Sequence, residues 1–341
     1  MTFSDRLTSS TTTIVDAVDR VDDDGHDVVI VASKLALRFD GDGALRLTAR
    51  PLRHHATSDG AGGTSFPHDF PLERPGTDVL LLGTCLPGRV PSASRIVSLA
   101  VGPMKKSIRV HGPRVWMKTL VGVRPGPAAN LVATPLRFEH VFGGRDGDAS
   151  DARNPVGRGF AINPDSLLGT EAHRLEPTDL TTLPPSSGCF APIDCNWAPR
   201  RSFAGTFDDE WSRRRAPVAP RDRDARYHSD ALPEQRSQRA LTTPLAVEIA
   251  GLHDGEPTRL TIPEYAVTVT TEVENQPPNT GPASLTRVLI DADARVIELL
   301  FVAQRRLPRK WEALRAIRVT TPSSLPDEIK FHGATPIQSD A

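Results

Sequence analysis

The chain is organised around residues 188–235, which read GCFAPIDCNWAPRRSFAGTFDDEWSRRRAPVAPRDRDARYHSDALPEQ. Its prolines exclude a long helix, because proline lacks the backbone N–H and clashes with the preceding turn. The stretch does not alternate as a strand does, yet it contains Trp197, Trp211 and Tyr227, although aromatic residues are only 5% of the chain. A disordered linker would be poor in such residues. We therefore expect an ordered, irregular segment, called the aromatic segment below, that its aromatic side chains fix to the rest of the protein.

The composition is that of an ordinary soluble protein. The 341 residues are 24% charged and 38% hydrophobic, with a formal net charge of -1. This balance gives no overall attraction to nucleic acid. Residues 1–20 contain no apolar run, and no stretch approaches the ~18 apolar residues of a spanning helix. With only three cysteines, Cys85, Cys189 and Cys195, a disulfide framework is not expected. We expect a cytoplasmic protein without membrane insertion.

Alternating apolar residues predict strands on both sides of the aromatic segment. From Val29 to Phe39 one parity is apolar, whereas the other carries Lys34 and Arg38, which indicates one buried face. Residues 78–85 are apolar almost throughout, as in a strand buried on both faces. Residues 285–302 predict a hairpin.

The predicted fold is mainly β, with two antiparallel β units, sandwich- or barrel-like, and few short helices. The predicted order is a flexible N-terminal arm or edge strand (1–25), an N-terminal β unit (26–142), an irregular connecting segment (143–240), a C-terminal β unit (244–320) and a tail (321–341). The connecting segment is Pro- and Gly-rich, aromatic and Arg-rich. Residues 208–215 predict two helical turns, because acidic residues stand at the start and arginines at the end.

No set of residues predicts catalysis. The chain has no G-x-S-x-G, H-E-x-x-H or phosphate-binding glycine motif. Histidines 54, 55 and 68 with Asp69 could bind a metal, and Cys189 or Cys195 with His173 or His228 could form a nucleophilic pair. Surface histidines and buried thiols are the favoured interpretations. We therefore expect no catalytic residues, no metal, no cofactor and no enzymatic activity.

Polar and aromatic residues in the irregular parts are the candidate functional residues. Such loops leave backbone groups without ladder partners, which charged side chains satisfy. These residues therefore organise the loops or bind a partner. They are Arg114, Trp116, Arg137, Glu139, Arg153, Asn154, Trp197, Arg200, Asp208, Trp211, Asp222, Asp224 and Gln235.

Four motifs in order resemble the domain of unknown function 2169 family of bacteria. They are RPGTDV at 74–79, VHGPRVW at 110–116, PLRFEHVFGG at 135–144 with RNPVGRG at 153–159, and the aromatic segment with its paired Asp222 and Asp224. The resemblance covers about residues 26–305. The chain departs from the family pattern at Arg223, where Phe is usual, at His228, where an aromatic is usual, and near Phe301, where a Trp-Arg is usual.

The resemblance implies an adaptor chaperone of the type VI secretion system. Such a protein would hold a toxic effector in the bacterial cytoplasm and help to load it onto the secretion spike, so the effector and possibly the spike protein are the expected partners. Two alternatives stay open from the residues: a hydrolase-type enzyme with a site that no motif announces, and a structural or effector-associated module exported with the spike.

Overall fold

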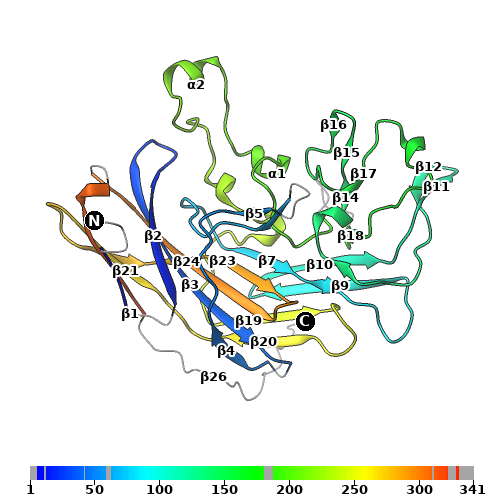
Figure 1. Cartoon of the computed structure of the whole chain (residues 1–341), viewed down its shortest axis with the longest axis horizontal. Coiled ribbons are helices and arrows are strands. Elements are labelled where there is room, and N and C mark those ends of the chain that lie inside the picture. Colours follow the sequence, from blue (N-terminus) through cyan, green and yellow to red (C-terminus); the bar gives the residue numbers. More distant parts are fainter. Residues whose placement is uncertain are drawn as a thin grey trace, which may run out of the picture.

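The computed structural model describes residues 6–10, 13–41, 43–58, 63–179, 187–308, 311–321 and 328–329. Within these ranges the protein is mainly β with two short helices, as the sequence predicts, and none of its sheets closes into a barrel. Figure 1 shows an elongated molecule with an arm that carries α2 above the sheets. Most of the expected tail, 321–341, lies outside the described residues.

The largest sheet has seven strands. Its order is β26 (Glu328–Ile329), β4 (Leu45–Thr48), β3 (Asp27–Phe39), β24 (Val296–Arg306), β23 (Ser284–Asp291) and β7 (Asp78–Leu82), with β2 (Ile14–Val21) also paired to β3. The predicted hairpin over 285–302 is confirmed as β23 and β24. The region expected as an arm or edge strand contains β2 and β1 (Leu7–Ser10).

Two smaller sheets flank this one. The five-stranded sheet has the order β18 (Leu175–Pro177), β10 (Met104–His111), β9 (Ser94–Val101), β19 (Leu245–Ala250) and β20 (Thr258–Ile262). The four-stranded sheet has the order β1, β25 (Leu314–Thr320), β21 (Thr268–Val273) and β22 (Asn279–Pro282). Because β3 pairs with β24 and β9 with β19, the ranges 26–142 and 244–320 share their sheets and do not fold into two separate ones.

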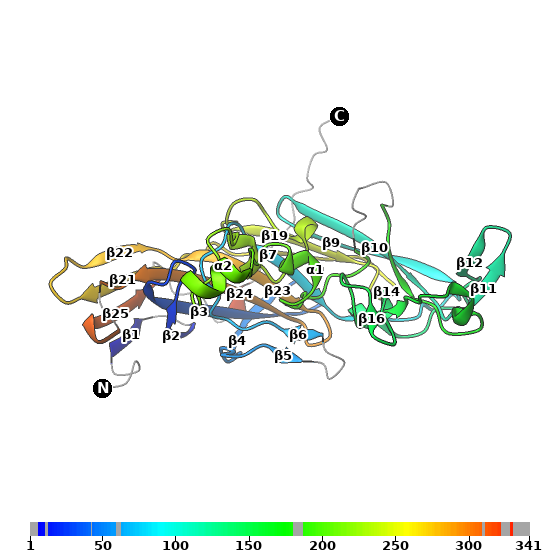
Figure 2. The same cartoon turned by 90° about the horizontal axis from the view of Figure 1, so that it is seen from above.

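The remaining strands and α-helices are short. They are the pairs β5 (Thr57–Ser58) with β6 (Thr64–Phe66), β8 (Thr84–Cys85) with β13 (Thr134–Pro135), β11 (Trp116–Thr119) with β12 (Gly122–Pro125), β14 (Phe142–Gly143) with β17 (Arg158–Gly159) and β15 (Arg145–Asp146) with β16 (Ala149–Ser150), and the helices α1 (Ala198–Arg201) and α2 (Asp209–Arg214). Strands β11 and β12 form one end of the molecule, beside β14 and β16 (Figures 1 and 2). Asp208 caps α2 by accepting from the Trp211 N–H, so the predicted helix is confirmed.

One apolar core joins the three large sheets. The odd residues of β3, such as Val29 and Leu37, face this core together with Val97 of β9 and Ile317 of β25. The even-numbered residues of β3 were expected to be exposed, but the first half of this face is buried, because Phe70 packs on it. Irregular residues before β7 thus cover a face that its charged residues had marked as exposed.

No helix among the described residues is long and apolar enough to cross a lipid bilayer.

Candidate functional site

The aromatic segment covers the outer edge of β7. The Leu81 N–H donates to the Phe190 carbonyl at 3.3 Å. The Gln235 side-chain amide donates to the carbonyls of Val79 at 3.0 Å and Phe190 at 2.9 Å. An uncovered strand edge offers pairing positions to other chains. Gln235, one of the predicted residues, therefore closes an edge of the largest sheet.

Behind this edge lies a buried ionic cluster. Arg287 of β23 binds the carboxylates of Asp69 and Asp230, each at 2.8 Å. Arg74 and Arg200 reach the same Asp230 at 3.2 Å and 3.1 Å. Burial alone would raise the pKa of Asp230, but the three guanidinium groups outweigh it and hold that pKa well below its ordinary value. Arg200, predicted from the sequence, thus links α1 to the sheet.

The cluster continues across the covered face of β3. Lys34 forms an ion pair with Asp69 and lies 3.4 Å from Glu298, which also pairs with Arg53. Ion pairs whose remaining groups are hydrogen-bonded compensate the cost of burying charge. The ion pairs of the cluster therefore hold the irregular residues before β7 and the aromatic segment against the seven-stranded sheet.

Most residues of this cluster were not among those predicted from the sequence. Its signal was a charged residue inside an otherwise apolar strand: Lys34, Arg287 and Glu298 each interrupt a run of buried residues. Charged residues are almost never fully buried unless they are paired. Such an interruption therefore indicates a buried partner, although it does not say which segment supplies it.

We expect His68, beside this cluster, to make stability depend on pH. Burial lowers the pKa of His68 to about 4, and its Nδ1 accepts the Phe70 N–H at 3.3 Å, which requires an unprotonated nitrogen. The folded pKa lies below the unfolded value of about 6.5, so this contribution is complete above pH 6.5 and is lost as the pH falls towards 4.

Urea unfolding of the wild type and of His68→Asn between pH 7 and 4 measures this effect. Asn keeps an acceptor but does not titrate. The wild type should lose on the order of 2 kcal/mol more than the variant. Equal losses would contradict the assignment to His68, because His140, whose pKa burial also lowers to about 4, is unchanged in both proteins.

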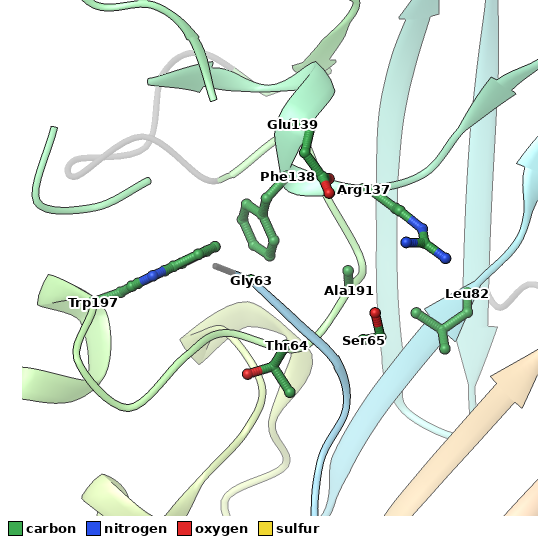
Figure 3. A pocket seen from close by; sticks show the side chains of 9 residues that line it. All are labelled: Gly63, Thr64, Ser65, Leu82, Arg137, Phe138, Glu139, Ala191 and Trp197. Atoms are coloured by element: carbon green, nitrogen blue, oxygen red, sulfur yellow. The ribbon is translucent and has the colours of Figure 1, made fainter. Parts of the chain in front are cut away.

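Trp197 is a buried anchor. It meets the ring of Phe138 edge-on with centroids 4.9 Å apart. Both line a small cavity with Arg137 and Glu139, from the predicted set (Figure 3). Its volume is about 20 Å³, which is room for about one water and far below the ~300 Å³ of small-molecule sites. These three predicted residues are thus brought together, but around a space too small for a substrate.

Other predicted residues organise their own loops. Asn154 is buried and donates to the carbonyls of Phe138 and Phe142, both at 3.0 Å. The exposed Arg153 follows Asp151 in the same turn. In the aromatic segment Asp222 accepts from Thr206 and Asp224 from Arg226, and the Trp211 indole donates to Val218. Trp211 is half-buried, so it anchors the arm less deeply than Trp197 anchors α1.

Arg114 and Trp116 belong to a second polar group at the β11–β12 end. Glu176 accepts from Arg114 at 2.6 Å, from His173 at 2.9 Å and from His111 at 3.0 Å. The hydrogen bonds from the two histidines and Arg114 hold the pKa of Glu176 well below its ordinary value. Trp116 is buried with its ring 5.6 Å from that of His173. The group fixes β18 against β10 and β11.

The thiols have environments unlike those of reactive cysteines. Burial raises the pKa of Cys189 to about 11, and burial also raises that of Cys195. A raised pKa leaves little thiolate, which is the nucleophilic form. His173 instead contacts Glu176, and His228 contacts Asp23 at 2.7 Å. This geometry offers no support for a Cys/His nucleophile.

The residues that the sequence suggested as metal ligands do not form one site, because they contact different partners. Asp69 lies in the buried ionic cluster, while His54 pairs with Asp16 at 3.1 Å. In the described ranges Asp22, Asp24 and His26 converge in the turn after β2. Arg306 already pairs with both of these carboxylates at 2.8 Å, so their charge is compensated by the protein itself.

The β11–β12 end exposes an unusual amount of apolar surface. Leu120 and Val121 at the hairpin tip are 107% and 76% exposed. Half of the large apolar side chains that are exposed in the described chain belong to this end. They are Val115, Met117, Leu120, Val121, Phe142, Ile162 and Leu168, called the apolar end below. Clustered exposed apolar residues mark surfaces that bind other proteins.

Comparison with known proteins gives one match. No curated protein and no solved structure matches the chain. A family model described as "Uncharacterized protein conserved in bacteria (DUF2169)" matches residues 24–301, which include the five-stranded sheet, the buried ionic cluster, the aromatic segment and the apolar end. Because this match spans most of the chain, the protein belongs to the DUF2169 family.

Proposed function

We propose that the protein is an adaptor chaperone of the type VI secretion system, which binds a toxic effector in the cytoplasm and helps to load it onto the secretion spike. The observation that carries the proposal is the apolar end, because seven exposed apolar side chains gathered there suit a protein partner. The motifs that resemble the family, and the role that the resemblance implies, supply the identity of that partner.

The internal construction of the protein supports a binding role. In the buried ionic cluster and the predicted loop residues, the polar groups make contacts within the chain, such as those of Arg200 and Asn154. The cavity beside Trp197 has room for about one water. These internal contacts hold the sheets and loops that carry the apolar end, and a surface that is ordered before binding lowers the entropic cost of binding.

Replacing Leu120 and Val121 by Asp should weaken capture of the proposed partner, a toxic effector of the type VI secretion system, by about tenfold or more. Both lie at an exposed hairpin tip, so the fold should tolerate the change. Val90→Asp is the matched control, because Val90 is 78% exposed outside the apolar end. Affinity capture from bacterial extract measures the effect. Undiminished capture by the double variant would refute this surface, and failure of the wild type to capture the toxin would refute the proposed function.

A further inference from the structure

An open hollow lies between the seven-stranded and four-stranded sheets, remote from the apolar end. It has a volume of about 260 Å³ and runs into a wider depression of about 430 Å³. The two share Asn279 of β22 and Gln304 and Arg305 of β24. We call the combined feature the β24 groove. Its floor is the last part of β24.

Hydrogen bonding along β24 alternates between its two neighbours. At its ends, Leu307 N–H donates to Asp27 at 2.8 Å and Phe39 N–H donates to Arg295 at 3.0 Å. In an antiparallel ladder every second residue bonds the same neighbour. The odd residues of β24 therefore bond β3, and its even residues, Gln304 among them, point their N–H and C=O groups the other way.

On that other side the neighbouring strand is β23, and its first residue, Ser284, does not reach Gln304. The pairing of β23 with β24 stops at Ser284 and Val302. Pro282, two residues earlier in the chain, belongs to β22 and pairs with Thr268 of β21 in the four-stranded sheet. Outside the strand ladders, no residue in the described ranges makes a backbone hydrogen bond to Gln304 or Arg306, and in the ladder with β3 these two residues hold the non-bonded positions. The groove thus presents main-chain donors and acceptors with strand spacing, which an extended polypeptide matches.

The charges of the groove indicate which extended segment fits. Arg305 donates to the neutral Gln276 side chain at 3.1 Å, and the described residues place no carboxylate within 4 Å of its guanidinium. Arg306 is already paired with Asp22 and Asp24. Two more charged residues line the groove. Arg74 is buried and already pairs with Asp230 at 3.2 Å, whereas Glu73 is exposed. A carboxylate on the incoming strand would therefore be paired at Arg305.

We infer that the β24 groove binds an extended segment of a partner protein by strand addition to residues 303–306, with an acidic side chain of that segment beside Arg305. The inference rests on the proposed role in holding a polypeptide and assigns it a second surface. The main chain supplies affinity in this mode, and side chains supply selectivity.

Gln304→Pro tests the main-chain contact. Proline removes the N–H that faces the groove, while the odd residues keep their bonds to β3. Gln304→Ala is the matched control: it also loses the 2.9 Å bond from the Glu73 N–H to the Gln304 side chain, but keeps the backbone donor. Short random peptides selected on the full-length wild type should bind Gln304→Ala comparably and Gln304→Pro about tenfold more weakly.

Arg305 variants supply a second readout that does not alter the backbone. Selected peptides should be rich in Asp and Glu, and they should lose binding to Arg305→Glu but keep it with Arg305→Lys. Peptides that bind Gln304→Pro or Arg305→Glu as tightly as the wild type would overturn the inference. So would self-association that Gln304→Pro abolishes without any peptide binding, because the groove would then serve a second copy of the chain.

Binding of the proposed toxic effector distinguishes failure of this inference from failure of the proposed function. Toxin that binds the wild type and is displaced by a selected peptide supports both. Toxin that binds wild type and Gln304→Pro equally overturns the groove while the proposed function stands. Toxin that binds neither protein overturns the proposed function, and the peptide measurements then decide the groove by themselves.

Discussion

Arg287→Met should lower the free energy of unfolding by about 3–5 kcal/mol, which is the usual cost of removing one partner from a buried ion pair. Arg287 is 1% exposed and pairs with Asp69 and Asp230. Methionine fills similar space without charge, so both carboxylates would lose their central cation. Asp230 keeps Arg74 and Arg200, but the loss of one cation raises the folded pKa of both carboxyls relative to the wild type. The stability deficit of the variant should therefore become smaller as the pH falls.

Arg214→Met is the matched control for this prediction. Arg214 lies 3.2 Å from Glu210, but the two side chains are 80% and 70% exposed. Solvent screens exposed pairs, so the loss should be at most about 0.5 kcal/mol. Urea unfolding of both variants at pH 7 measures the difference. Equal midpoints would show that water reaches Arg287 and that the cluster does not hold the aromatic segment to the sheet.

The fold could be predicted from the sequence as far as local patterns reach. Period-two alternation identified β3 and the β23–β24 hairpin, and the charge order of residues 208–215 identified α2. Pairing between distant strands could not be predicted, because alternation fixes which face of a strand is buried and not which strand lies beside it. The pairing of β3 with β24 joins residues more than 250 positions apart, and the two expected β units therefore merge in shared sheets.

The candidate site was predictable in its irregular parts and not in its buried charges. Arg200 and Asn154 were identified because loops need side chains to satisfy their backbone groups. Trp197 was identified as an aromatic anchor, and Gln235 through a motif that resembles the family. Lys34 was assigned to an exposed face, since a charge usually lies in solvent. Its burial depends on Asp69, which comes from a segment that the sequence marks only as a polar loop.

Trp197→Ala should cost about 3–5 kcal/mol, as truncation of a buried Trp does when the surroundings cannot collapse into the space. Trp197 is 3% exposed, packs against Phe138 and precedes α1, whose Arg200 enters the buried ionic cluster. The loss should therefore loosen the aromatic segment from the sheet before the sheets unfold. Limited proteolysis by trypsin at Arg201 should become faster at temperatures where the far-ultraviolet circular dichroism is still that of the wild type.

Trp211→Ala is the control for Trp197→Ala. It shows whether the expected loosening of the aromatic segment is specific to Trp197 or follows from the loss of any tryptophan in the segment. Trp211 is half-buried in the arm and donates to Val218 at 2.8 Å, remote from Phe138. Removing it should cost about 1–2 kcal/mol and expose the arm at residues 213–215, while cleavage at Arg201 stays slow. If both variants released the same tryptic fragments at the same rate, the segment would be held as one unit by its charges, and the indole of Trp197 would not be its anchor.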